Sequence, residues 1–248
     1  YDWIFFNNVD YAISIGKHMA VLKARRKGYS YKVGSMLARN FCTVPYSRCY
    51  AMAYQEEYLL KDGLLTKAYD VVNFCDANTP FQQPRLIDQR MHKVSGMKEN
   101  INGSDVIRGF QSEIMGISMK DDPDKGRGKA GILGIYEEGG RFPNLTTTWE
   151  INSPSYQKGV FTTGLQIVFG TGGSDDVDFE GLEKMFYDPD TYNILAFNNM
   201  WDEGALGNKC AFFVPAYMHF EGCIDIAGNS DIPAAKEFQQ DQRDLKKK

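Results

Sequence analysis

Short apolar runs that end in polar or charged residues recur along this chain. A continuous apolar run is typical of a strand buried on both faces, as in a parallel α/β sheet. The predicted strands are 18–22, 105–110, 112–119, 131–136, 162–169, 192–197 and 210–214. Apolar residues spaced three or four apart predict helices between them. These are 31–39, 46–60, 64–74, a segment reaching about 157, 179–186 and 231–248.

The alternation of strands and helices favours an α/β fold with a mainly parallel sheet. Residues 1–17 predict a short helix or strand. The stretch 78–103 is polar and contains Pro80, Pro84 and Gly96, so we expect a loop with at most one short helix there. No apolar run approaches the roughly 20 residues that a membrane-spanning helix needs.

Composition narrows the class of protein only slightly. The 248 residues are 43% hydrophobic and 24% charged, with a net charge of −4. These values are ordinary for a globular protein, and they give no overall basic field that would indicate nucleic-acid binding. The five cysteines and three histidines are scattered and contain no Cys-x-x-Cys pair, so no zinc site is predicted.

Two adjacent carboxylates, Glu137 and Glu138, follow the predicted strand 131–136. Like charges side by side at a strand end require a cation, a proton or water nearby. Ligands of open α/β sheets bind at this carboxyl edge. We therefore expect a magnesium-nucleotide site in which Glu137 binds the metal and Glu138 activates a water. The alternative is a solvated turn, because Gly139-Gly140 follows.

A basic loop, Lys23-Ala-Arg-Arg-Lys-Gly-Tyr-Ser30, connects the first predicted strand to a helix. Strand, glycine-containing basic loop and helix is the arrangement of a phosphate-binding loop. With Ser30 in the last position of the usual motif, Tyr29 stands where lysine is expected and Lys23 where the first glycine is expected. Either Lys23 or Lys27 would then supply the cation. A basic surface turn is the simpler alternative.

A third predicted strand ends in Gly170-Thr171-Gly172. Along the chain, the basic loop ending at Ser30 comes first, the pair Glu137-Glu138 second and this glycine-containing segment third. Here the chain resembles the ATPase domain of the large terminase subunits of tailed phages, the motors that pump DNA into capsids. The residues that carry the resemblance are Lys23-Ala-Arg-Arg-Lys-Gly-Tyr-Ser30, Arg127-Gly-Lys-Ala-Gly-Ile-Leu-Gly-Ile-Tyr-Glu-Glu-Gly-Gly-Arg-Phe142, Ile167-Val-Phe-Gly-Thr-Gly-Gly173, Phe213-Val-Pro-Ala216 and Asp225-Ile-Ala-Gly-Asn-Ser-Asp231.

The resemblance implies a three-layer P-loop fold of the RecA-like (ASCE) type with a small lid-like C-terminal part. It implies a core to about residue 200, a lid or linker from about 201 to 248, and no C-terminal nuclease domain in this chain. It also implies ATP and Mg²⁺ as ligands. The deviant phosphate loop would comprise Lys23, Arg25, Arg26, Lys27, Gly28, Tyr29 and Ser30, with Lys23 preferred to Lys27 as the phosphate-binding lysine.

The same resemblance implies roles for the remaining site residues. Ser30 and Glu137 would hold magnesium, although the family more often has Asp at the second position. Glu138 would be the catalytic glutamate and Thr171 the residue that couples hydrolysis to motion. Arg127 matches the place of an arginine finger that completes a neighbouring subunit's site.

The implied partners are double-stranded DNA, a portal protein, a small terminase subunit and further copies of this chain in a ring, with no membrane. DNA would be held through its backbone, with Lys120, Lys125 and Lys129 as candidates. The implied location is the cytoplasm of the infected bacterial host, docked transiently on the procapsid. Two other functions remain open: another RecA-like nucleic-acid ATPase or helicase, and an assembly module that binds nucleotide without hydrolysing it. The absence of lysine at position 29 favours the second.

Overall fold

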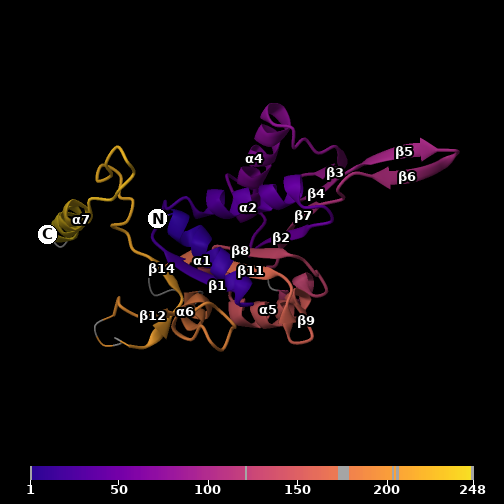
Figure 1. Cartoon of the computed structure of the whole chain (residues 1–248). Helices are drawn as coiled ribbons and strands as arrows, with labels where there is room; N and C mark the ends of the chain where they lie inside the picture. Colours follow the sequence, from indigo (N-terminus) through magenta and orange to yellow (C-terminus); the bar gives the residue numbers. More distant parts are fainter. Residues whose placement is uncertain (1, 121, 173–178, 203, 205–206, 247–248) are drawn as a thin grey trace.

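A mainly parallel sheet of eight strands forms the centre of the protein, with helices on both faces (Figure 1). The computed structural model describes residues 2–120, 122–172, 179–202, 204 and 207–246. The sheet order is β14-β1-β11-β8-β2-β7-β4-β3; the first six of these strands are parallel to one another, while β4 pairs antiparallel with β7 and β3. In chain order the strands are β1 (Met19–Lys23), β2 (Arg48–Ala53), β3 (Arg85–Gln89), β4 (His92–Ser95), β7 (Glu113–Ser118), β8 (Leu133–Glu137), β11 (Leu165–Thr171) and β14 (Phe212–Val214).

Side chains of successive strand residues enter two different cores, which is why the central strands are mainly apolar. Met19, Val21 and Ile167 belong to one buried cluster, while Ala20 and Val168 belong to the other. The first cluster is covered by α1 (Asp2–Ser14), α2 (Tyr29–Thr43) and α4 (Leu64–Asn78). The second is covered by α5 (Leu145–Asn152) and α6 (Glu180–Tyr187). The three-layer α/β fold expected from the sequence is therefore confirmed.

Close packing of α2 against α4 depends on Gly34. A Cβ atom at this position would lie 3.2 Å from the backbone nitrogen of Ala68, so a larger residue would push the two helices apart. This contact fixes α2, whose first turn carries the end of the basic loop.

Three predicted segments differ from the structure, and two of them were expected to be a helix and a strand. The segment 46–60 was expected to be helical, but Arg48–Ala53 forms β2 and only Glu57–Leu60 (α3) is helical in it. A central strand that is buried on both faces has no alternation, so its apolar run is easily taken for one turn of a helix. The strand expected at 192–197 is reduced to a bridge between Ile194 and His18 and to β12 (Phe197–Asn198), which pairs with β13 (Lys209–Cys210).

The polar stretch 78–103 contains strands rather than a loop with a short helix. β3 and β4 extend the sheet, and β5 (Met97–Ile101) pairs with β6 (Ser104–Arg108) in a hairpin that projects from the body (Figure 1). The hairpin turns at Asn102-Gly103, both at positive φ, as the tight turns of hairpins require. β5 is apolar only at its ends, Met97 and Ile101, so its sequence shows little of the pattern that predicts a buried strand, whereas β6 overlaps the strand predicted at 105–110.

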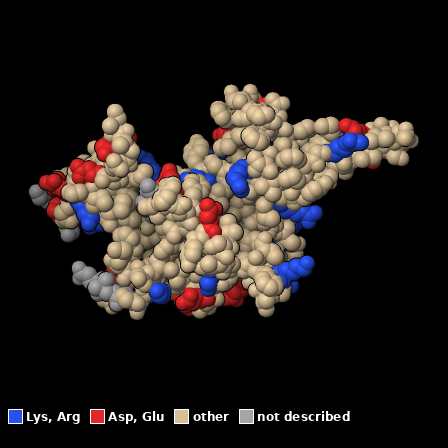
Figure 2. Space-filling model, in the orientation of Figure 1, with Lys and Arg blue, Asp and Glu red and all other residues tan. Residues whose placement is uncertain are grey.

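The remaining short elements connect the layers. They are η1 (Pro123–Gly126), η2 (Gly139–Arg141), η3 (Ser153–Tyr156), β9 (Gln157–Lys158) and β10 (Phe161–Thr162). The last helix, α7 (Ile232–Lys246), lies at the edge of the molecule beyond β14 (Figure 1). Among the described helices, none combines the length and apolar character required to cross a membrane. Basic and acidic residues are interspersed over the face in Figure 2, without a continuous basic stripe.

Candidate functional site

Three neighbouring parallel strands bring the predicted site residues to one edge of the sheet. Lys23, the last residue of β1, is in register with Thr171, the last residue of β11. β11 pairs in turn with β8, which ends at Glu137. Because the three strands run in the same direction, their carboxyl ends and the loops that follow them lie together. This is the edge at which open α/β sheets bind ligands.

Ser30 and Glu137 are joined directly. The Ser30 hydroxyl donates a hydrogen bond of 2.7 Å to Oε1 of Glu137. Glu137 is only 5% exposed, and its burial raises the pKa of the carboxyl to about 7. The hydrogen bond from Ser30 opposes this rise, and the neighbouring charge of Glu138 adds to it. The other carboxylate oxygen, Oε2, is buried and has no hydrogen-bond partner among the residues that the structure describes.

These two side chains fit a magnesium ion. Mg²⁺ takes hard oxygen ligands and retains several waters, so a protein commonly supplies only one or two of them. The Ser30 hydroxyl and the Glu137 carboxylate provide such a pair. Oε2 of Glu137, which accepts no hydrogen bond from the described residues, is an oxygen that could bind the ion. The described residues include no group of three or more His, Cys, Asp or Glu side chains that would hold a metal without help from substrate.

Glu138 links the other two strand ends. Its backbone lies in the left-handed region, with φ of 50°, and this bends the chain sharply after β8. Oε1 of Glu138 accepts a hydrogen bond of 3.2 Å from Nζ of Lys23, which is 7% exposed. Oε2 accepts from the backbone nitrogen and the hydroxyl of Thr171, at 3.4 and 3.5 Å. Lys23, Glu138 and Thr171 therefore form one contact chain.

Two glycines allow the loop after β8 to approach β11. A Cβ atom on Gly170 would lie 2.8 Å from Leu182 and 3.1 Å from the backbone nitrogen of Gly140. A Cβ atom on Gly139 would lie 2.4 Å from the Val168 side chain. Small residues at these positions therefore hold Glu138 next to Thr171.

A cavity of about 340 Å³ opens at this edge. Its lining comprises Lys23, Arg25, Arg26, Tyr58, Lys61, Asp62, Gly63, Glu137, Glu138, Arg141 and Thr171. Five of these are cationic and three acidic, so the lining has an excess of positive charge that suits a polyanion. Three larger cavities, of about 710, 680 and 370 Å³, lie elsewhere, and none of them is lined by the converging residues Lys23, Glu137, Glu138 and Thr171.

Five of the lining residues were not predicted as site residues. Tyr58, Lys61, Asp62 and Gly63 follow β2, which lies beside β8 in the sheet. Had the segment 48–53 been recognised as a strand, the loop after it would have been expected at the same edge. Arg141 follows Glu138 by three residues, and its backbone nitrogen donates to the Glu138 carbonyl at 2.8 Å.

The structure explains why tyrosine stands at the usual lysine position. Tyr29 is 1% exposed and packs its ring against Phe5 and Phe169, with centroid distances of 5.0 and 6.1 Å. It is a core residue that anchors the first turn of α2. The residue before it, Gly28, has φ of 68°, a conformation that glycine adopts without strain.

Lys23 and Lys27 point to different partners. Lys23 contacts Glu138 inside the cavity, whereas Lys27 donates to the backbone carbonyls of Ala216 and Met218, beyond β14. Lys27 is not among the residues that line the cavity. Of the two lysines that the sequence left open, only Lys23 lies beside the converging carboxylates.

Arg127 lies outside the cavity. It is exposed, and its guanidinium forms an ion pair of 2.8 Å with Asp124 in the same turn. The structure therefore does not bring Arg127 to the converging carboxylates of its own chain. Gly173, the last residue of the predicted coupling segment, lies outside the described residues.

Solved structures with the same arrangement identify the fold. Two structures of the large terminase ATPase domain of Thermus phage P74-26 cover 91% of this chain and 82% of their own length. One, a mutant, has a TM-score of 0.58 at 14% sequence identity, and the other a TM-score of 0.57 at 15%. The fold is that of a terminase ATPase domain. The resemblance inferred from the sequence is thus confirmed in the fold.

At this level of identity the likeness establishes the fold alone. A scan against family models and a search of curated proteins found no match to the sequence. The chemistry of the terminase-like fold in this chain therefore has to be argued from its own residues.

Proposed function

We propose that this chain is a Mg²⁺-dependent ATPase and the motor domain of a viral DNA-packaging machine. One observation carries the proposal: residues from three distant segments are in contact at the carboxyl edge of one sheet. Ser30 contacts Glu137, and Glu138 contacts both Lys23 and Thr171. The terminase ATPase fold supports it. In this proposal the core ends near residue 200 and the lid or linker occupies 201–248.

Phosphoryl transfer depends mainly on positioning and on neutralising charge. Lys23 would bind the β- and γ-phosphates, and Arg25, Arg26 and Gly28 would line their path. Ser30 and Glu137 would hold Mg²⁺, which supplies charge neutralisation at the phosphate oxygens when bound. Glu138 would orient the attacking water and accept its proton.

The contact between Lys23 and Glu138 gives the site a second property. While the two side chains are paired, the ammonium is directed at the carboxylate. Phosphate oxygens carry more charge than one carboxylate, so a triphosphate would draw Lys23 away and leave Glu138 free to accept a proton from water. Thr171, which contacts the same carboxylate, would respond to this change. The pairing therefore would delay activation of the water until the triphosphate is in place.

The wider role rests on the terminase ATPase fold. Copies of the chain would form a ring in which Arg127 of one copy supports hydrolysis in the next, an effect worth about 10³–10⁵ in rate for known arginine fingers. The ring would grip double-stranded DNA by its backbone, through residues such as Lys120, Lys125 and Lys129. It would act in the host cytoplasm, docked on the procapsid, with a portal protein and a small terminase subunit as partners.

Phosphate release and nucleotide binding, measured on the same samples, test the proposal. We expect wild-type chain to release phosphate from ATP only with Mg²⁺, and Glu138→Gln to bind ATP with little change while its release falls by about 10²–10⁴. Glu183→Gln, on α6, is the matched control and should behave as wild type.

The same measurements separate the alternative functions. Binding without hydrolysis in wild type, and no difference in Glu138→Gln, would favour an assembly module that holds nucleotide. The buried Tyr29 in place of lysine is the observation that keeps this alternative open. Absence of ATP binding altogether would overturn both assignments.

A further inference from the structure

Lys27 connects the basic loop to the last part of the chain. The residue lies between Arg26 and Gly28, which have φ of 59° and 68°. Two left-handed residues around one position give the loop a defined bend. Arg25 and Arg26 line the cavity, while the side chain of Lys27 leaves the loop toward the segment that follows β14.

The contacts of Lys27 match the three N–H donors of an ammonium group. Nζ donates to the carbonyl oxygen of Ala216 at 2.8 Å, to that of Met218, and to that of His219 at the long distance of 3.5 Å. Burial, reinforced by the charge of Lys32, lowers the pKa of Lys27. No carboxylate forms an ion pair with Lys27 within the described ranges, so neutral carbonyl groups solvate its charge.

The chain beyond β14 is packed largely on itself. The ammonium of Lys236 in α7 lies 4.7 Å from the ring centre of Tyr217, and the rings of Phe220 and Phe238 lie 5.3 Å apart. The Ser230 hydroxyl accepts a hydrogen bond of 2.9 Å from the His219 backbone. These contacts connect the start of residues 216–246 to α7, and we call this segment the C-terminal unit.

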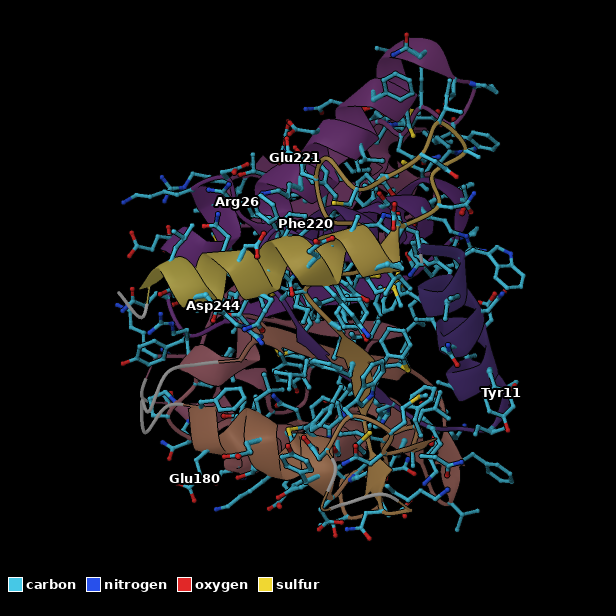
Figure 3. The ribbon with its side chains drawn as sticks, turned by 90° about the vertical axis from the view of Figure 1, so that its left-hand side faces the viewer. Tyr11, Arg26, Glu180, Phe220, Glu221 and Asp244 are labelled. Carbon is cyan, nitrogen blue, oxygen red and sulfur yellow. The ribbon has the colours of Figure 1, made fainter. Side chains whose placement is uncertain are left out.

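The views of the molecule agree with this division. α7 lies at the periphery, beyond the edge strand β14 (Figure 1). Seen from that side, α7 crosses the face of the molecule with Phe220 and Glu221 just above it and Arg26 on the same side (Figure 3). The tip of the basic loop and the start of the C-terminal unit thus meet in one place.

We propose that Lys27 is a latch that holds the C-terminal unit against the basic loop and that a polyphosphate bound in the loop releases it. Phosphate oxygens bind an ammonium group more strongly than neutral carbonyls do, because the hydrogen bonds are charge-assisted. A triphosphate would also change the backbone of the bend that directs Lys27. Since coupling between two equilibria is reciprocal, nucleotide weakens the latch and the latched state disfavours nucleotide.

The latch rests on the proposed nucleotide site, but part of it can be tested without nucleotide. Amide hydrogen exchange of residues 216–231 reports how often the C-terminal unit opens. In nucleotide-free protein, Lys27→Met retains most of the unbranched side chain and loses all three hydrogen bonds. We expect exchange in this segment to be about tenfold faster than in wild type, as the loss of about one net hydrogen-bonding contribution implies.

The second measurement adds ATPγS with Mg²⁺. We expect faster exchange of 216–231 in wild type and no further increase in Lys27→Met, which is already released. Arg25→Met is the matched control: it removes a cation from the same loop, but one that lines the cavity. It should weaken nucleotide binding and leave exchange of 216–231 unchanged in the nucleotide-free protein.

The outcomes distinguish the latch from the nucleotide site. Equal exchange in nucleotide-free wild type and Lys27→Met, with both folded by circular dichroism, would overturn the latch whatever the protein binds. Binding of ATPγS without any change of exchange in wild type would overturn its release by nucleotide. Absence of binding, measured separately by calorimetry, would overturn the proposed function, while faster exchange in Lys27→Met would still support the latch.

Discussion

The Ser30 hydroxyl lies 2.7 Å from the Glu137 carboxylate, although 107 residues separate them in the sequence. Since this contact brings together two hard oxygen ligands suited to Mg²⁺, we predict that Ser30→Ala lowers the affinity for Mg²⁺-nucleotide by about tenfold, or roughly 1.4 kcal/mol, and that Ser30→Thr retains it. Titration with a fluorescent nucleotide at several Mg²⁺ concentrations measures this. Ser35→Ala is the control, because Ser35 lies on the same helix and donates to the Tyr31 carbonyl instead. Equal affinity in Ser30→Ala and Ser35→Ala would remove Ser30 from the site.

Glu137 makes stability depend on pH. Its pKa rises from 4.5 to about 7 on folding, mainly because the carboxyl is buried. The folded state holds this proton more tightly, so the contribution of Glu137 to stability is complete below about pH 4.5 and is lost as pH rises through about 7. Glu137→Gln carries no charge, and we expect it to exceed wild type in stability by roughly 1–3 kcal/mol at pH 8. Urea denaturation at pH 5 and pH 8 measures the difference, which should grow with pH; a constant difference would contradict the assignment.

Lys23 is expected to carry most of the lysine contribution to phosphate binding. Lys23→Met removes a buried cation beside Glu138, so we predict a loss of ATP affinity of at least about tenfold, or roughly 1.4 kcal/mol. Lys61→Met is the matched control: Lys61 lines the same cavity but is 79% exposed on its side chain and pairs with Glu57. Calorimetric titration with ATP compares the two. A larger effect at Lys61 than at Lys23 would place the phosphates at the opposite wall of the cavity.

Gly170 and Gly172 flank Thr171 but differ in their surroundings. A methyl group on Gly170 would press on Leu182 and on the backbone of Gly140, while one on Gly172 would find its nearest neighbour, Leu22, at 3.8 Å. We predict that Gly170→Ala destabilises the fold by about 1–3 kcal/mol and slows hydrolysis, whereas Gly172→Ala does neither. Thermal unfolding and phosphate release check this. Equal stability and equal hydrolysis rates in the two variants would contradict this prediction, because the loop after β8 would then accommodate the added methyl group at Gly170.

Arg127 should act on a neighbouring copy, because it lies outside the cavity of its own chain. Arg127→Ala and Glu138→Gln would each be inactive alone. In a mixture, a site with Glu138 from one chain and Arg127 from the next is complete, so we expect recovered phosphate release that increases with protein concentration. The control is a mixture of Arg141→Ala with Glu138→Gln. Arg141 lines the cavity of its own chain, so this mixture should not recover phosphate release. Activity no greater than the sum of the separate variants would refute the role of Arg127 in a neighbouring site.

The sequence predicted the site better than it predicted the connections around it. Lys23, Glu137 and Thr171 were found because each ends an apolar run that is long enough to be recognised as a buried strand. The segment 46–60 was wrongly predicted as a helix, because β2 is buried on both faces and lacks a period of two. Because of that error, Tyr58 and Gly63 were not predicted to line the cavity. Their position there follows only once β2 is known to lie beside β8.

The contacts of Lys23 and Lys27 could not be predicted from the sequence, for a different reason. Lys23 and Lys27 are both basic loop residues, four positions apart, and either fits a phosphate. Their directions are set by the left-handed bend at Arg26 and Gly28 and by the return of the chain after β14, about 190 residues later. Such long-range contacts leave no periodic pattern in the loop itself.

The place of β1 between β11 and β14 has a mechanical consequence. Lys23 is in register with Thr171 on one side and with Val214 on the other. A displacement of this single strand end would therefore move both Thr171, which contacts Glu138, and β14, the strand from which the chain continues toward α7. If the proposed ATPase is correct, a shift of β1 on nucleotide binding would reach the C-terminal part of the chain directly through β14, without passing through the rest of the sheet.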